Sequence, residues 1–297
     1  MKKLQFLKKI ISLFLFPFLS LGLFSCEDAA NQIVIDGNKP PDDNTISQNL
    51  QKNYISRLYI DLLGRKPTSQ EEIAALQTLE NKTGDKENRK NTVSFILNKA
   101  EYFTNEINIV NSVLLNNIPA REIDQQIYVF NLLLQDQNNA PAFDIYRKEL
   151  ARLTKLKTAA QEFSQKRIDI KEVYIRYINN NIYDAINMGS ENYVISTFQH
   201  FLLRAPTQSE LEEGIRMVNN FPSKSFLQNG DSKEDYNTAL MNSVGYYEGQ
   251  TRLLFQRFLF RDATSEEIGA FAKGYADTQN YQDLQTQILI SDEYAGF

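Results

Sequence analysis

From Gln51 to the end of the chain, apolar residues recur three and four positions apart, and the strict alternation typical of strands is rare. This period places apolar side chains on one face of a helix. In the first predicted helix that face carries Tyr54, Leu58, Leu62 and Leu63. The pattern predicts an all-α fold, with further helices at about 92–116, 121–135, 142–166, 170–187, 193–203, 208–219, 236–247, 250–260, 265–274 and 281–291.

The end of the first predicted helix recurs twice later in the chain. Residues 62–68 read LLGRKPT, residues 201–207 read FLLRAPT and residues 258–264 read FLFRDAT. An aromatic residue precedes each shared arginine by six positions. We expect each arginine to bond the last carbonyls of its helix, or to pair with an acidic residue near the helix that closes the copy. The three arginines are Arg65, Arg204 and Arg261.

Each copy then carries a threonine followed three positions later by a glutamate. In such a capping box the threonine hydroxyl accepts from the backbone amide three residues on, and the glutamate accepts from the threonine amide. Each copy therefore predicts a helix, a short turn and a capped helix. Gly64 is replaced by Leu203 and Phe260 in the later copies, so we expect no need for a left-handed glycine in the turn. The predicted caps are Thr68 with Glu71, Thr207 with Glu210, and Thr264 with Glu267.

The copies also end alike, with a tyrosine that follows an apolar pair, at Tyr102, Tyr246 and Tyr294. A motif that recurs at both ends indicates related structural units. Units 2 and 3 abut and are expected to pack together, whereas unit 1 is separated by about 85 residues and is expected to be independent. The body is thus divided into repeat unit 1 at 51–106, a helical insertion at 107–191, repeat unit 2 at 192–249 and repeat unit 3 at 250–297.

The first 25 residues have a different pattern, with four lysines, no acidic residue and an apolar run that ends at Phe24. A basic start and about 15 apolar residues are typical of a signal peptide, whereas a membrane-spanning helix needs about 20. The run closes with Leu23-Phe24-Ser25-Cys26, which resembles the lipobox of bacterial lipoproteins, although Phe24 is bulkier than usual there. The resemblance implies a signal peptide at 1–25 and lipidation of Cys26, the only cysteine. The alternative is an ordinary secretory signal with an incidental cysteine.

Residues 26–50 contain two adjacent prolines and five acidic residues, a composition typical of a flexible tether. Glu27 and Asp28 resemble the acidic export signal of surface lipoproteins in Bacteroidetes-type bacteria. This resemblance implies an outer-membrane protein that faces outward, with the periplasmic face as the alternative. Removal of four lysines changes the net charge from −5 to −5 − 4 = −9, which argues against a nucleic-acid partner. We therefore expect the protein to attach to the membrane through the lipid on Cys26.

The sequence RLYIDLLGRKPT at 57–68 and the ending SDEY at 291–294 resemble small helical domains of secreted bacterial proteins. Those domains are mostly of unknown function and are distantly similar to phycobilisome linker modules. The first copy also resembles a domain of unknown function found beside cytochrome-type modules in planctomycetes. The resemblance covers about 150 residues in three pieces. It implies a helical repeat fold.

No reactive constellation is visible in the body. His200 is the single histidine, and one histidine cannot build the usual multi-histidine metal site. Residues 229–237 gather three acidic side chains but lack the ligand spacing of a calcium-binding EF-hand. Residues 142–171 are basic within an acidic body, which most often marks a solvated face and, as the alternative, a docking surface. We therefore expect neither a metal nor a cofactor.

Together these patterns favour a membrane-anchored binding or scaffolding component of the cell envelope, with a protein partner and without catalysis. One alternative is an enzyme that processes envelope glycans with dispersed carboxylates, because such pairs leave no local signature. The other is an accessory of a cytochrome-type redox system, although the chain has no Cys-x-x-Cys-His haem motif.

Overall fold

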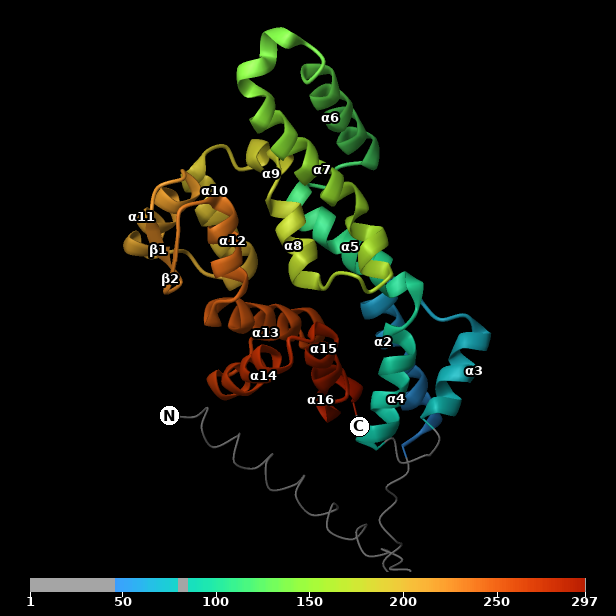
Figure 1. Ribbon diagram of the computed structural model, residues 1–297. Helices are drawn as coiled ribbons and strands as arrows, with labels where there is room; N and C mark the ends of the chain where they lie inside the picture. Colours follow the sequence, from blue (N-terminus) through green and yellow to red (C-terminus); the bar gives the residue numbers. More distant parts are fainter. Residues whose placement is uncertain (1–45, 80–84, 297) are drawn as a thin grey trace, which may run out of the picture. The chain divides into compact units, whose positions relative to one another are not determined.

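The computed structural model describes residues 46–79 and 85–296. These residues are mostly helical, which confirms the all-α fold (Figure 1). A short antiparallel pair, β1 (Ser223–Ser225) and β2 (Gln228–Gly230), was not indicated by the sequence pattern. The helices are α2 (Gln48–Leu63), α3 (Ser69–Thr78), α4 (Lys86–Leu97), α5 (Ala100–Leu115), α6 (Ala120–Leu133), η1 (Gln137–Ala142), α7 (Phe143–Ser164), α8 (Ile170–Ile178), α9 (Asn181–Ile186), α10 (Ser190–Thr197), the π-helical turn η2 (Phe198–Leu202), α11 (Gln208–Val218), α12 (Lys233–Met241), α13 (Val244–Leu259), α14 (Ser265–Thr278), α15 (Tyr281–Leu289) and α16 (Asp292–Ala295).

One helix boundary lies earlier than the sequence pattern places it. The pattern predicts two helices at 236–247 and 250–260, but the break between helices falls at residues 242–243. There the Ser243 hydroxyl accepts a hydrogen bond from the Tyr246 amide at 3.1 Å and caps the start of α13. The segments assigned to repeat units 2 and 3 therefore share one continuous helix.

The three expected threonine caps each start a helix. Thr68, Thr207 and Thr264 precede α3, α11 and α14, and each hydroxyl accepts from the glutamate amide three residues on at 3.3 Å. Each glutamate carboxylate in turn accepts from the threonine amide at 2.8–2.9 Å. Both halves of the capping box are present at all three turns.

Each repeat arginine forms two parallel hydrogen bonds with the glutamate of its own capping box. The guanidinium also lies over the aromatic ring six residues earlier, with 5.0–5.7 Å between its central carbon and the ring centroid. The hydrogen bonds from arginine lower the pKa of Glu210 and Glu267 to about 2. The donor–acceptor distances are 2.7 and 2.8 Å for Arg65 with Glu71, 2.8 and 2.6 Å for Arg204 with Glu210, and 2.9 and 2.7 Å for Arg261 with Glu267.

Two of the arginines bind a second carboxylate, at the start of the closing helix. Arg65 lies 2.6 Å from Glu101, and Arg261 lies 2.6 Å from Glu293. The second unit has Gly245 at the matching position, so it offers no carboxylate there. All three arginines donate to the carbonyl of the residue that follows them, not to the last carbonyls of the preceding helix.

The residue before each arginine has a left-handed backbone in all three turns, and glycine occupies this position only in the first, as expected from the sequence. The angle φ is +73° at Gly64, +53° at Leu203 and +54° at Phe260. This conformation costs a residue with a side chain about 1–2 kcal/mol, because Cβ approaches the following carbonyl oxygen. The second and third turns therefore carry strain that the first avoids with glycine.

Unit 1 packs directly on unit 3, so the expectation that it is independent is wrong. The Tyr54 hydroxyl donates to the Leu289 carbonyl at 3.1 Å, and Arg57 donates to the Tyr294 carbonyl at 2.9 Å. The Tyr294 hydroxyl donates to the Asp61 carboxylate at 2.8 Å. Burial raises the pKa of Asp61, because its charged form loses water. The chain from residue 45 onward forms one compact unit.

Gly249 permits the close crossing of η2 and α13. A Cβ atom at this position would lie 2.0 Å from the Phe201 carbonyl oxygen and 2.8 Å from the Leu202 Cα. Both neighbours are backbone atoms and cannot rotate away as a side chain could. Glycine is therefore the residue that fits here, and its absence of a side chain sets the distance between the two helices.

Alanine at any of the three caps should destabilise the body in a single unfolding transition. Loss of a threonine cap costs about 0.5–2 kcal/mol, and the contacts between units 1 and 3 couple the first cap to the others. Urea unfolding of a chain of residues 27–297 should therefore show a lower midpoint for Thr68→Ala, Thr207→Ala and Thr264→Ala. Thr154→Ala, an exposed control whose hydroxyl bonds only the Leu150 carbonyl, should match the wild type. A separate transition for Thr68→Ala would contradict the coupling.

Candidate functional site

Helix α6 lies beside α7 and is attached to the fold through one of its faces (Figure 1). Ile123, Ile127 and Phe130 on that face pack against the hydrophobic core. The rings of Phe130 and Tyr146 have their centroids 5.9 Å apart. No residue of α6 is fully buried. The helix is therefore an outer layer, and its other face is open to solvent.

The open face of α6 is also apolar. Tyr128, Val129 and Leu132 are 63%, 46% and 45% exposed. Their spacing of three and four residues aligns them along one side of the helix, opposite the side that packs on α7. A helix that is apolar on both sides is expected to have a partner on both. This apolar stripe is therefore a candidate interaction surface.

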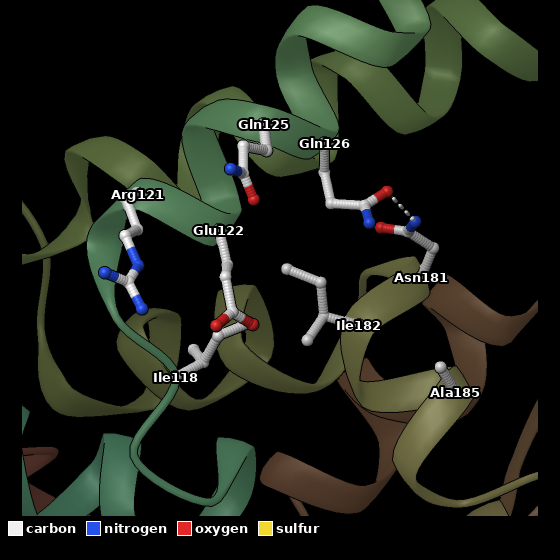
Figure 2. Close-up of a pocket in the computed structure, with 8 residues that line it drawn as sticks. All are labelled: Ile118, Arg121, Glu122, Gln125, Gln126, Asn181, Ile182 and Ala185. Atoms are coloured by element: carbon white, nitrogen blue, oxygen red, sulfur yellow. Dashed lines mark hydrogen bonds between the residues drawn. The ribbon is translucent and has the colours of Figure 1, made fainter.

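A pocket of about 520 Å³ lies between the start of α6 and α9 (Figure 2). Glu122 and Gln125 extend into it from α6, and Ile182 extends into it from α9. Gln125 lies about one helical turn before Tyr128 and Val129 on the same side of α6. Gln125 therefore lies between the pocket and the apolar stripe on α6.

Helix α9 is held in place by an asparagine cap and a buried glutamate. The Asn180 side-chain oxygen accepts from the Ile182 and Tyr183 amides, both at 3.0 Å. Glu149 on α7, which is 7% exposed, accepts from the Asn181 amide at 2.6 Å. Bonds to the backbone of α9 therefore hold this wall of the pocket.

The pocket carries polar groups that the fold leaves without partners. The Asn181 Nδ2 atom donates to Gln126 Oε1 at 3.1 Å, whereas the Asn181 Oδ1 atom is buried and accepts no hydrogen bond from the described residues. An unpaired buried acceptor costs about 1–3 kcal/mol. Arg121 and Glu122 are exposed, and neither forms an ion pair within the described part of the chain. The exposed Arg121 and Glu122 can thus pair with charged groups of a bound segment.

A larger hollow of about 800 Å³ lies between α7, α8 and α12, and several of the charges that line it pair with one another. Arg152 binds Glu149 at 3.0 Å and also binds Glu234. Arg176 binds two further glutamates, each at 2.9 Å. Part of the basic run at 142–171 is therefore neutralised within the fold, and this hollow is a weaker candidate than the α6 face.

The other candidate residues from the sequence, His200 and the acidic segment 229–237, form no reactive cluster within the described part of the chain. His200 lines a third hollow, where its Nδ1 atom lies 3.1 Å from the Tyr183 hydroxyl. Asp235, in the acidic segment 229–237, accepts from the Ser232 hydroxyl at 2.7 Å and so helps to start α12. In residues 46–79 and 85–296, no group of three or more His, Cys, Asp or Glu side chains is placed to hold a metal ion.

The remaining predicted residues lie apart from the α6 face. The cap threonines, their glutamates and the repeat arginines form three separate turns, and none of them lines the pocket. Cys26, Glu27 and Asp28 lie outside the described residues. Over the part of the chain that the structure describes, no helix has the length and apolar character needed to cross a membrane.

Helix α6 lies in the predicted insertion, and the sequence pattern predicts no site on this helix. A signal was present, because Ile123 and Ile127 lie on one side of this helix while Val129 and Leu132 lie on the other. A helical period cannot show which of two apolar faces is covered. The second wall of the pocket comes from α9, and the sequence carries no sign of that contact.

A scan against protein-family models, a search of curated proteins and a search of solved structures each found no match for this chain.

Proposed function

We propose that this chain is a lipid-anchored binding or scaffolding protein of the bacterial cell envelope, without catalysis, which presents the open face of α6 to a protein partner. The single observation that carries the binding role is the exposed stripe Tyr128, Val129 and Leu132, near a pocket that the same helix lines. The sequence Leu23-Phe24-Ser25-Cys26 supports the anchor.

The composition of the α6 face suits a protein partner. Tyrosine and arginine are enriched among the residues that dominate binding energy at protein interfaces, and this face contains Tyr128 and Arg121. Full burial of a side chain of this size contributes about 1.5–3 kcal/mol, so a half-exposed one contributes roughly half as much when a partner covers it.

The anchor and the tether would keep this face at the membrane while allowing it to search for its partner. A coil of about 21 residues, from Cys26 to the start of α2 at Gln48, would have a root-mean-square reach of ~25 Å. An acidic body is repelled by anionic lipid, so lipid on Cys26 would provide the attachment. Burial of each acyl methylene contributes ~0.8 kcal/mol, which makes several acyl chains a durable anchor.

Cys26→Ala should abolish lipidation, because the chain has no other cysteine. In cells fed a labelled fatty acid, the wild-type protein should carry the label and the variant should carry none. Ser25→Ala keeps the cysteine and a small residue before it, and should still be labelled. Labelling of Cys26→Ala equal to the wild type would rule out this anchor.

The acidic pair Glu27 and Asp28 predicts a location on the outer face of the outer membrane. Protease added to intact cells should then degrade the protein, while a periplasmic marker protein stays whole. Glu27→Gln combined with Asp28→Asn should protect the protein, because the export signal loses its charge. Full protection of the wild type until the cells are lysed would place it on the periplasmic side.

A photo-crosslinking amino acid at position 129 should capture the partner in intact cells. The same probe at Ile73, which is 56% exposed on α3, is the matched control and should capture nothing specific. Leu132→Ser, added to the chain that carries the probe at position 129, should reduce the yield of crosslinked adduct several-fold. The free energy of unfolding should change by no more than about 0.5 kcal/mol, because Leu132 is exposed. Equal adducts from positions 129 and 73, or an unchanged yield with Leu132→Ser, would show that the stripe is not the interface.

A further inference from the structure

A small apolar cavity of about 190 Å³ lies where α5, α8, η2 and α13 meet. Its walls include the buried side chains of Val110, Leu114 and Phe201. Val113 also lines the cavity and is 52% exposed, which places it at the opening. The cavity is separate from the α6 face and uses none of the residues assigned to partner binding.

An ion pair forms the polar part of the cavity wall. Arg257 Nη1 lies 2.9 Å from Glu106 Oε1, and Glu106 is 2% exposed. Arg257 also donates to the Asp61 carbonyl at 2.7 Å, and the Glu106 carboxylate accepts from Gln285 at 3.5 Å. Burial alone would lower the pKa of Arg257, but the neighbouring Glu106 carboxylate raises it overall, so Arg257 stays charged.

The cavity wall has no net charge at neutral pH. The charges of Glu106 and Arg257 cancel. Burial lowers the pKa of His200, which is therefore neutral near pH 7. Tyr174 is neutral because burial raises the pKa of its hydroxyl, and this hydroxyl lies 3.4 Å from the Gln250 oxygen. A charged ligand would find no free counter-charge here, and an unpaired buried charge is strongly unfavourable.

The second repeat departs from the other two at this cavity. The helix before the turn is α-helical up to Leu63 in unit 1 and up to Leu259 in unit 3, whereas unit 2 has the π-helical turn η2. His200 and Phe201 of this turn line the cavity, and so does Leu203, whose φ is +53°. π-Helical turns and left-handed residues with side chains cost energy and often occur at functional sites. The π-helical turn, which units 1 and 3 lack, and the left-handed residue, which all three units share, both bring side chains to this cavity.

We propose that this cavity binds a small uncharged molecule that has an apolar body about the size of one aromatic ring and one hydrogen-bonding group. A cavity of about 150 Å³ lined by apolar side chains can hold benzene, so the space suits a ring with a short substituent. The ion pair offers both a donor and an acceptor to a hydroxyl or carbonyl group. The apolar walls contribute affinity by removing the ring from water.

The test compares three probes of similar size, namely benzyl alcohol, benzoate and benzylamine. Chemical-shift titration of the mature polypeptide, residues 27–297 without lipid, avoids detergent that would compete for the probe. Benzyl alcohol should bind saturably, and the two charged probes should bind about tenfold more weakly or worse, because their charge stays unpaired. Binding of benzoate or benzylamine as tight as benzyl alcohol would overturn the proposal, as would the absence of saturable binding of benzyl alcohol.

Two variants assign the binding to this cavity. Val113→Trp should block the opening and abolish benzyl alcohol binding, whereas Ile73→Trp, an exposed control on α3, should leave it unchanged. Glu106→Gln should leave Arg257 without a counter-charge and reverse the preference in favour of benzoate. If Glu106→Gln fails to fold, Val113→Trp decides alone, and benzyl alcohol binding that survives it would overturn the proposal.

Discussion

The glutamate of each capping box is held from two sides, by the threonine amide that starts its own helix and by the arginine that ends the turn before it. The hydrogen bonds from these two partners fix the angle between two successive helices. They occur at Glu71, Glu210 and Glu267. Two parallel bonds from a guanidinium are stronger and more directional than a single ion pair. Three turns of the same geometry place three helix pairs that can then pack on one another.

The packing of those helix pairs creates the larger body. Helix α13 closes the second unit and opens the third, and Gly249 lets it approach η2 to backbone contact. The hydroxyl of Tyr294, near the end of the third unit, reaches Asp61 in the first. Units 1 and 3 are far apart along the chain but are coupled, because the last helix, α16, packs on the first described helix, α2.

Both candidate sites lie where the regular repeat stops. The α6 face belongs to the insertion, which adds an outer helix whose second apolar side has no cover. The small cavity lies at η2, a π-helical turn of the second unit that the matching helix of the first unit lacks. The three arginine–glutamate turns stabilise the fold through paired groups. The insertion and the π-helical turn instead leave the Asn181 oxygen unpaired and a cavity unfilled. Binding sites are expected at such places.

Local features of this protein follow from its sequence alone, because they depend on residues within one or two helical turns of each other. The helical period predicts the all-α fold, and the spacing from Thr68 to Glu71 predicts the capping box. The left-handed backbone at Leu203 was not predicted, because leucine rarely adopts it and the surrounding packing enforces it. Contacts between distant segments decided the rest. The packing of unit 1 on unit 3, the wall that α9 adds to the pocket and the pairing of Glu106 with Arg257 join residues far apart in the chain, and no local pattern encodes which of them meet.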